Sequence, residues 1–314
     1  MKNKYNILVT GCGGDIGLSI GKILKSHPMF DRVIGCDMSE EHAGKFIFDE
    51  TLKINACSSD NYLPTLEKIV KEYGIDIIVP MSEPELRMLT EKNIETTFLN
   101  KKLICANIKS RQVGFDKLAT VEFLKNSGLP YPETQIINEV QNPVFPLILK
   151  SRAGSGSKSI FILKSEDEFN FYKKKYPDFI VQELLVESED EFTCGVYRGS
   201  DTKTMSIIYK RKLFGDYSGF GIVIENDAIS KLLEIIAEKI NLLGSINVQL
   251  KFSKDGPCVF EINPRFSSTV KFRHMMGFQD LIWSIEDALG MTSAPYNKPL
   301  VGTKFYKGFQ EYVQ

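Results

Sequence analysis

Histidine, paired cysteines and long apolar runs are all scarce in this sequence of 314 residues. The three histidines, His27, His42 and His274, are too far apart for a metal-binding spacing and leave little room for histidine-based catalysis. The 6 cysteines include no Cys-x-x-Cys pair, which argues against a zinc or redox motif. No stretch approaches the roughly 18 apolar residues of a membrane span. We therefore expect no membrane partner.

The sequence also lacks a large net charge of either sign. The 39 Lys and Arg residues almost balance the 40 Asp and Glu residues, so the formal net charge is −1, and 43% of the residues are hydrophobic. Disordered chains combine low hydrophobicity with a large net charge, and dedicated DNA-binding proteins are normally basic. The composition excludes both classes, so we expect no nucleic-acid partner. The length suggests two or three domains of about 100–200 residues each.

The first residues do not form a secretion signal. Their apolar run covers only residues 7–9, whereas a signal peptide needs about 7–15 apolar residues. We therefore expect a cytoplasmic protein whose cysteines stay reduced.

The first third of the sequence alternates strands and helices. We predict strands at residues 7–9, 32–37 and 76–80, and helices after the first strand and at residues 62–73. This alternation is typical of a parallel sheet with helices on both faces.

A glycine cluster follows the first predicted strand. Gly11, Gly14 and Gly17 have the spacing found in extended short-chain dehydrogenases, and Asp37 ends the second strand where an acid could bind a ribose. That family also needs a Tyr-x-x-x-Lys pair, and no tyrosine here has Lys four positions on. One interpretation is a dinucleotide site. The other, which the missing pair favours, is a tight strand-to-helix turn that binds no dinucleotide.

Two acids follow the strand at residues 76–80. Open α/β sheets collect ligands at the carboxyl ends of their strands, so Glu83 and Glu85 could bind a substrate amine, with Glu83 as our candidate. The alternative is helix capping, in which Ser82 caps a helix and the two acids interact favourably with its dipole.

The middle third carries a loop of small residues between two strands. Asp116 is a plausible N-cap of a helix that stops at Gly128, and Lys150 ends a strand at residues 145–150. The loop at residues 151–158 is rich in Gly and Ser, and a strand at 160–163 follows. Backbone N–H groups in such a loop can approach phosphate oxygens, and Lys158 adds charge. The alternative is a flexible hairpin loop.

The last third contains a predicted hairpin, whose two strands flank the loop at residues 254–256. A loop centred on Asp255 pairs Asn247 with Asn263 and Gln249 with Glu261. Strand side chains alternate, so all four point to one face. We expect the opposite, apolar face to contain Val248, Leu250, Phe260 and Ile262.

The polar face has the chemistry of a metal and phosphate site. Mg²⁺ prefers oxygen ligands, which Glu261, Gln249 and Asn263 can supply. Arg265 lies just beyond and could neutralise a phosphoryl group or hold a carboxylate. Asn247 is our candidate for substrate contact. The alternative is a polar strand face exposed to solvent.

Two further segments are predicted near a substrate. Arg211 follows a strand at residues 205–209 and either contacts a phosphate or substrate carboxylate or marks a solvated strand end. The segment at residues 216–221 is expected to be a loop on the substrate side. A helix at residues 228–243 shows the apolar spacing of core packing.

Together these segments resemble the ATP-grasp superfamily, in particular carboxylate–amine ligases akin to the large chain of carbamoyl phosphate synthetase. The resemblance implies an α/β fold with α+β lobes: an N-terminal Rossmann-like pre-ATP-grasp domain at residues 1–110, a small lobe at 111–185 and a C-terminal lobe at 186–314. It also implies that Glu191 holds the ribose, with Glu189 and Asp190 as neighbouring candidates. The residues implied for ATP are Lys117, Lys150, Gly154, Ser155, Gly156, Ser157, Lys158, Gln182, Glu183, Leu184, Leu185 and Glu191.

The resemblance further implies an activity. A substrate carboxylate would attack the γ-phosphate of ATP to form an acyl phosphate, and an amine would displace the phosphate. Catalysis would rest on Arg265, Lys150 and Arg211, with Mg²⁺, or Mn²⁺ in its place, held by Gln249, Glu261 and Asn263. The expected partners are small carboxylates and amines, and the family makes a homodimer plausible. The competing hypotheses are an NAD(P)-dependent short-chain oxidoreductase and an ATP-binding module without turnover.

Overall fold

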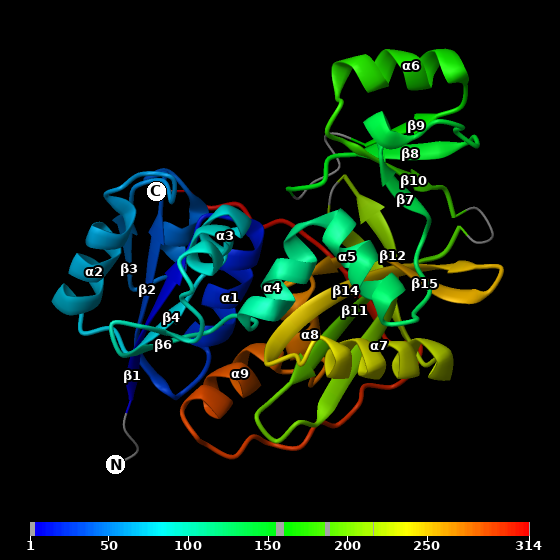
Figure 1. The fold of residues 1–314 in the computed structure, drawn as a ribbon. Helices are drawn as coiled ribbons and strands as arrows, with labels where there is room; N and C mark the ends of the chain where they lie inside the picture. The colour runs from blue at the N-terminus through cyan, green and yellow to red at the C-terminus, as the bar shows by residue number, and fades with distance from the viewer. Residues whose placement is uncertain (1–3, 155–159, 186–188, 216, 314) are drawn as a thin grey trace.

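The computed structural model describes residues 4–154, 160–185, 189–215 and 217–313 (Figure 1). The strands in these ranges form three sheets. The N-terminal sheet has the order β3-β2-β1-β4-β6-β5, and its strands are parallel except for the last pair. Its elements are β1 (Tyr5–Thr10), α1 (Asp15–Lys25), β2 (Phe30–Asp37), η1 (Ala43–Phe46), β3 (Glu50–Lys53), α2 (Tyr62–Glu72), β4 (Ile77–Val79), α3 (Glu83–Glu91), β5 (Thr97–Phe98) and β6 (Lys101–Leu103).

The parallel arrangement follows from the sequence pattern. The central strands are apolar on both sides, because Ile7 and Val9 pack into one core cluster while Leu8 packs into the other. A strand buried on both faces needs a helical layer on each side, which the alternation of strands and helices supplies. The predicted parallel α/β sheet is confirmed.

The glycine cluster allows α1 to pack closely against the turn that precedes it. Gly11 has a φ of 59°, which favours glycine. A β-carbon on Gly17 would overlap the carbonyl oxygen of Gly11 and would lie 2.8 Å from Cys12 Cα. Asp37 Oδ2 accepts a hydrogen bond from the Gly13 N–H at 2.9 Å and so braces the same turn. These contacts support the tight-turn interpretation of the cluster.

This packing leads to a stability prediction. Gly17→Ala should lower the free energy of unfolding by about 1–3 kcal/mol, the usual cost of overpacking. Gly14→Ala is the matched control, since the nearest atom to its β-carbon is 3.6 Å away, and it should cost less than about 1 kcal/mol. Urea denaturation of both variants measures the difference. Equal stability of the two variants would contradict the proposed role of Gly17.

A small antiparallel sheet forms a separate lobe, which we call the small lobe. Its order is β7-β10-β8-β9, and α6 packs on one face through Phe169, which joins Leu149, Leu163 and Val181 in a compact apolar cluster. Figure 1 shows this lobe standing away from the other two sheets. Its elements are β7 (Thr134–Ile136), η2 (Ile137–Glu139), β8 (Leu147–Lys150), β9 (Ile160–Leu163), α6 (Glu166–Lys175) and β10 (Ile180–Glu183).

The third sheet, which we call the large lobe, is antiparallel with the order β15-β14-β11-β12-β13-β16. Helix α7 buries its apolar stripe against it, with Ile229, Leu233 and Ile236 fully covered. Helices α8 and α9 instead carry Val270 and Leu281 into a core shared with the N-terminal sheet. The strands are β11 (Glu191–Arg198), β12 (Thr204–Phe214), β13 (Tyr217–Ile224), β14 (Gly244–Ser253), β15 (Gly256–Asn263) and β16 (Lys304–Tyr306), and the helices are α7 (Asp227–Lys239), α8 (Val270–Met275) and α9 (Asp280–Ala288).

Two further helices connect the N-terminal sheet to the small lobe. They are α4 (Ile108–Phe115) and α5 (Lys117–Asn126). The expected domain boundary after residue 110 falls inside α4. No helix in the described ranges is long and apolar enough to cross a membrane.

The hairpin register is confirmed at its polar end. Asn247 pairs with Asn263, and Gln249 pairs with Glu261, as the alternation predicts. The four side chains therefore share one face of the large lobe.

The register then shifts, because a bulge follows Gln249. Leu250 pairs with Val259 instead of Phe260, and Ser253 pairs with Gly256, which leaves a two-residue turn. The extra residue is Phe260. The prediction that Phe260 belongs to the apolar face is therefore wrong, and Val259 is buried there instead.

Two predictions about β12 and β13 are also wrong. The strand expected to end at residue 209 continues to Phe214, so Arg211 lies within a strand and not beyond its end. Residues 217–221, expected to form a loop, belong to β13, which pairs with β12 over most of its length. Cross-strand pairing thus outweighs the unfavourable clustering of basic and glycine residues in these segments.

Candidate active site

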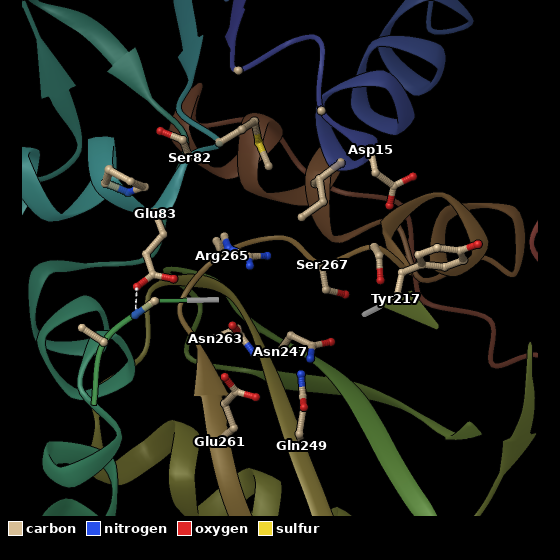
Figure 2. Close-up of a pocket in the computed structure, with 18 of the residues that line it drawn as sticks. Asp15, Ser82, Glu83, Tyr217, Asn247, Gln249, Glu261, Asn263, Arg265 and Ser267 are labelled. Carbon is tan, nitrogen blue, oxygen red and sulfur yellow. Dashed lines mark hydrogen bonds between the residues drawn. The ribbon is translucent and has the colours of Figure 1, made fainter. Parts of the chain in front are cut away.

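One large cleft collects the predicted functional residues. Its volume is about 1170 Å³, and its lining comes from the N-terminal sheet, the small lobe and the large lobe. Figure 2 shows the polar face of β14 and β15 on one side of the cleft, the start of α1 and the turn before α3 on the other, and Arg265 between them. The candidates that line it are Glu83, Lys117, Lys150, Gly154, Gln182, Glu183, Leu184, Leu185, Glu191, Arg211, Asn247, Gln249, Glu261, Asn263 and Arg265.

Some predictions lie outside the described residues. These are the loop residues Ser155, Gly156, Ser157 and Lys158.

Lys150 is a buried cation at the end of β8, only 6% exposed. Its ammonium group donates to Gln182 Oε1 at 2.8 Å and to the carbonyl oxygen of Phe260 at 3.4 Å. Burial lowers the pKa of Lys150 to about 8, and Lys117 acts in the same direction while Glu261 opposes the shift. No ion pair of Lys150 is found in the described part of the chain, so the site favours an anionic ligand.

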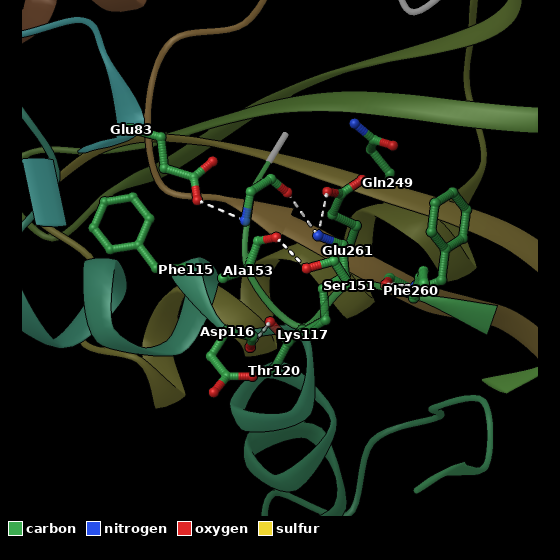
Figure 3. Close-up of polar contacts among 12 residues, drawn as sticks. Glu83, Phe115, Asp116, Lys117, Thr120, Ser151, Ala153, Gln249, Phe260 and Glu261 are labelled. Carbon is green, nitrogen blue, oxygen red and sulfur yellow. Dashed lines mark hydrogen bonds and ion pairs between the residues drawn. The ribbon is translucent and has the colours of Figure 1, made fainter. Parts of the chain in front are cut away.

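Lys117 links the small lobe to the polar face. Its Nζ donates to the carbonyl oxygen of Gly154 at 2.9 Å and lies 3.7 Å from Glu261 Oε1 (Figure 3). The start of its helix is fixed by Asp116, which caps the Leu118 N–H and accepts from Arg152. Lys117 and Lys150 therefore approach the cleft from two different elements.

The polar face offers oxygen donors for a hard cation. Glu261 supplies a carboxylate, and Gln249 and Asn263 supply amide oxygens beside it (Figure 2). The described residues contain no group of three His, Cys, Asp or Glu side chains suited to a metal. A cation here would thus rely on amide oxygens in addition to one carboxylate, a donor set that fits Mg²⁺. Gln249 Oε1 also accepts from Arg211 Nη2 at 2.8 Å.

Arg211 holds two candidate ligands in place. Its Nε donates to Glu191 Oε1 at 3.0 Å, and its side chain is only 8% exposed. Of the three acids considered for the ribose, Glu191 is the one that lines the cleft, whereas Asp190 pairs with Lys210 at 2.6 Å. The arrangement favours Glu191.

Two buried donors belong to residues that line the cleft, Asn247 and Arg265. Asn247 is 1% exposed, and its Oδ1 accepts from the Thr193 hydroxyl, which turns its amide nitrogen away from that contact. This Nδ2 has no hydrogen-bond partner among the described residues. Arg265 uses Nη1 for the carbonyl oxygen of Phe266. Burial lowers the pKa of Arg265, while the charges of Glu83 and Glu261 oppose the shift. A buried amide N–H without a partner among the described residues, in a cleft that a guanidinium also lines, is suited to an anionic ligand.

The acids before α3 have different roles. Ser82 caps the helix by accepting from the Glu85 N–H, so the capping interpretation is confirmed. Glu85 is fully buried, with hydrogen bonds from Tyr62 OH and Thr10 Oγ1 at 2.5 Å each. Burial raises the pKa of Glu85, and these hydrogen bonds oppose the shift. Glu85 therefore links α3 to the carboxyl end of β1 through Thr10, while Glu83 lines the cleft.

Sequence reasoning missed three contributors to the cleft. Thr193 orients Asn247, the Phe260 carbonyl accepts from Lys150, and Arg87 holds Glu83. Of these three, only Thr193 could have been found from the sequence, because strand alternation places its side chain on the same face as Glu191. The position of the Phe260 carbonyl depends on the bulge in β15, and the contact of Arg87 depends on α3.

For adenine, the geometry limits the choices. The Glu183 N–H donates to the Glu133 carbonyl at 2.9 Å. This N–H is therefore not free to contact the adenine of the ATP that the resemblance implies.

Comparison with known proteins accounts for most of the chain. Residues 115–269 match the family described as the ATP-grasp domain, and residues 7–104 match the PylC-like N-terminal domain. The two matches correspond to the two lobes and to the N-terminal sheet.

Individual relatives are distant. A carbamoyl-phosphate synthase from Methanobrevibacter smithii is 24% identical over 230 residues, covering 65% of this chain and 60% of that protein. A D-alanine–D-alanine ligase from Fusobacterium nucleatum is 25% identical over 154 residues, covering 46% and 52%. This chain thus matches less than two thirds of the length of either relative.

The fold has close counterparts among solved structures. An ADP complex of N5-carboxyaminoimidazole ribonucleotide synthetase superimposes with a TM-score of 0.75 and 16% identity, over 95% of this chain and 80% of that chain. The shared architecture and the two family matches lead to one conclusion. The chain belongs to the ATP-grasp superfamily of ligases and synthetases, with a PylC-like N-terminal domain.

Proposed function

We propose that this ATP-dependent ligase joins a small carboxylate to an amine through an acyl phosphate. The observation that carries the proposal is the cleft itself, which brings two lysines, Arg265 and a polar face of one carboxylate and three amides together. The lysines and Arg265 suit the phosphates, and the face suits a divalent cation.

Each part of the cleft has a role for ATP in this proposal. Lys117 and Lys150 contact the phosphates, and Glu191, oriented by Arg211, accepts from the ribose hydroxyls. Glu183 and Leu185 receive adenine through their backbones. These roles are supported by the presence of the residues in the lining of one cleft and by the buried Lys150, for which the described residues supply no ion pair.

Glu261, Gln249 and Asn263 would hold the metal ion. Such an ion would neutralise phosphate charge when bound. Arg211 already holds Gln249 in place, so little side-chain ordering is needed when the nucleotide arrives.

The proposed reaction depends on positioning the substrates and neutralising phosphate charge more than on proton transfer by side chains. A carboxylate oxygen of the substrate attacks the γ-phosphorus of ATP, the bond to the β–γ bridging oxygen breaks, and ADP leaves. The neutral amine then attacks the acyl carbon, phosphate departs with the bonding pair, and the departing phosphate takes the proton that the nitrogen loses. In this proposal Arg265 and the Nδ2 of Asn247 would hold the carboxylate during these steps, and Glu83 is a candidate for contact with the amine.

The test is ADP release across a panel of carboxylates and amines. We expect release to need both a carboxylate and an amine and to be accompanied by amide formation, detected by mass spectrometry. ATP binding without ADP release under any pair would instead favour a binding module. NADH binding in a titration would favour the oxidoreductase alternative.

A further inference from the structure

Glu83 occupies an unusual position between the N-terminal domain and the phosphate end of the cleft. It is the first residue of α3, and its side chain is 12% exposed. Its Oε1 accepts from Arg87 Nε at 3.0 Å and Nη2 at 2.7 Å, and from the Gly154 N–H at 3.2 Å (Figure 3). One carboxylate oxygen thus joins α3 to the chain that follows β8.

Arg87 fixes the position of the Glu83 carboxylate. Arg87 lies one helical turn after Glu83, and its guanidinium also contacts the carbonyl oxygen of Phe115 and stacks over that ring, with 4.8 Å to the centroid. A carboxylate oxygen that already accepts from two N–H groups of one arginine loses little further entropy on accepting another donor. The contact with Gly154 is therefore supported by an ordered partner.

Gly154 has both of its backbone polar groups engaged. Its N–H points to Glu83, its carbonyl oxygen accepts from Lys117 Nζ, and its φ of 95° favours glycine. Lys117 is one of the two lysines proposed for the phosphates. The Gly154 N–H thus lies in the part of the cleft where phosphate oxygens are expected, yet a carboxylate oxygen takes it.

A carboxylate and a phosphate are both negatively charged acceptors, so they compete for one N–H donor. We propose that Glu83 is an internal competitor of ATP: its carboxylate holds the Gly154 N–H and must release it before the phosphates of ATP engage. The inference rests on the proposed ATP site. It adds that the N-terminal domain restrains nucleotide binding and keeps turnover low without substrates.

The test compares ATP binding and basal ADP release in Glu83→Ala and wild type. We expect the dissociation constant for ATP, measured by calorimetry, to fall by about fivefold in the variant, because a competing charge-assisted hydrogen bond is removed. ADP release without added substrates should rise. Unchanged or weaker ATP binding in a folded Glu83→Ala protein would overturn the inference.

The freed guanidinium of Arg87 could produce the same change, since Glu83→Ala leaves Arg87 without its acid. The double variant Glu83→Ala/Arg87→Ala is therefore compared with Arg87→Ala. The double variant should still bind ATP more tightly than Arg87→Ala, whereas equal affinity would show that the freed Arg87 causes the gain and would overturn the inference. Glu91→Ala, an exposed acid at the end of the same helix, is the matched control. If wild type binds no ATP, the proposed function fails instead.

Discussion

Glu261→Ala should abolish ATP turnover, with the rate of ADP release falling by at least about a thousandfold, while the fold is kept. Glu261 is the carboxylate of the polar face, and its Oε1 lies 3.7 Å from Lys117 Nζ. Its removal takes away both the charged ligand proposed for a cation and the partner of Lys117, which is proposed to bind phosphate. The side chain is 23% exposed, so its loss leaves no sealed cavity. ADP release and the thermal unfolding midpoint are measured together.

Two further variants sharpen this prediction. Glu261→Gln keeps an oxygen donor but loses the charge, and it should lose most of the turnover. Asp255→Ala lies at the exposed tip of the same hairpin and should keep turnover within about twofold of wild type. Near-normal turnover in Glu261→Ala would remove Glu261 from the metal site.

Strand alternation is enough to place the polar side chains on one face, but the predicted pairs of that face depend on more than the turn. The turn has two residues, and its register alone would pair Gln249 with Phe260. The bulge after Gln249 shifts the register by one residue and gives the pairs of Gln249 with Glu261 and Asn247 with Asn263. The bulge after Gln249 depends instead on packing, since burying Val259 against α7 moves Phe260 into the cleft. A single sequence does not show whether Val259 or Phe260 packs into the core.

The acids near α3 show a second limit. Glu83 and Glu85 are two residues apart in the same segment, yet one extends into the cleft and the other is sealed beneath Thr10 and Tyr62. Thr10 is 75 residues away from Glu85 along the chain, so no local pattern distinguishes the two acids. Their roles follow from the tertiary fold.

Strand length was underestimated for a similar reason. Residues 210–212 are basic and favour a solvated end when considered alone. In the structure Arg211 is neutralised by Glu191 across the β11–β12 pair, and Lys210 is matched by Asp190. These charge pairs keep residues 210–211 in the strand, and pairing with β13 extends β12 to Phe214.

Lys150→Met should weaken ATP binding by at least about a hundredfold, because a buried ammonium that faces phosphates in a low-dielectric cleft is worth several hydrogen bonds. The side chain is 6% exposed and meets Gln182 Oε1 and the Phe260 carbonyl. Methionine has a similar volume, so the loss of charge is the main change. Calorimetric titration with ATP gives the dissociation constant. Lys164→Met, an exposed lysine just after β9, is the control and should bind ATP as wild type does.

The pH dependence of binding separates charge from packing at Lys150. Burial lowers the pKa of Lys150 to about 8. Phosphates bind the protonated form, so wild-type affinity should be constant below this value and should fall as the pH rises through it. Binding raises the pKa of Lys150 again, because the phosphate charge favours the ammonium form, and calorimetry in buffers of different ionisation enthalpy should detect proton uptake near pH 8. Lys150→Met has no such group, so its weak affinity should show neither the fall nor the uptake. A variant that kept the wild-type pH profile would show that another group titrates, and Lys150 would then be a packing residue and not the phosphate ligand.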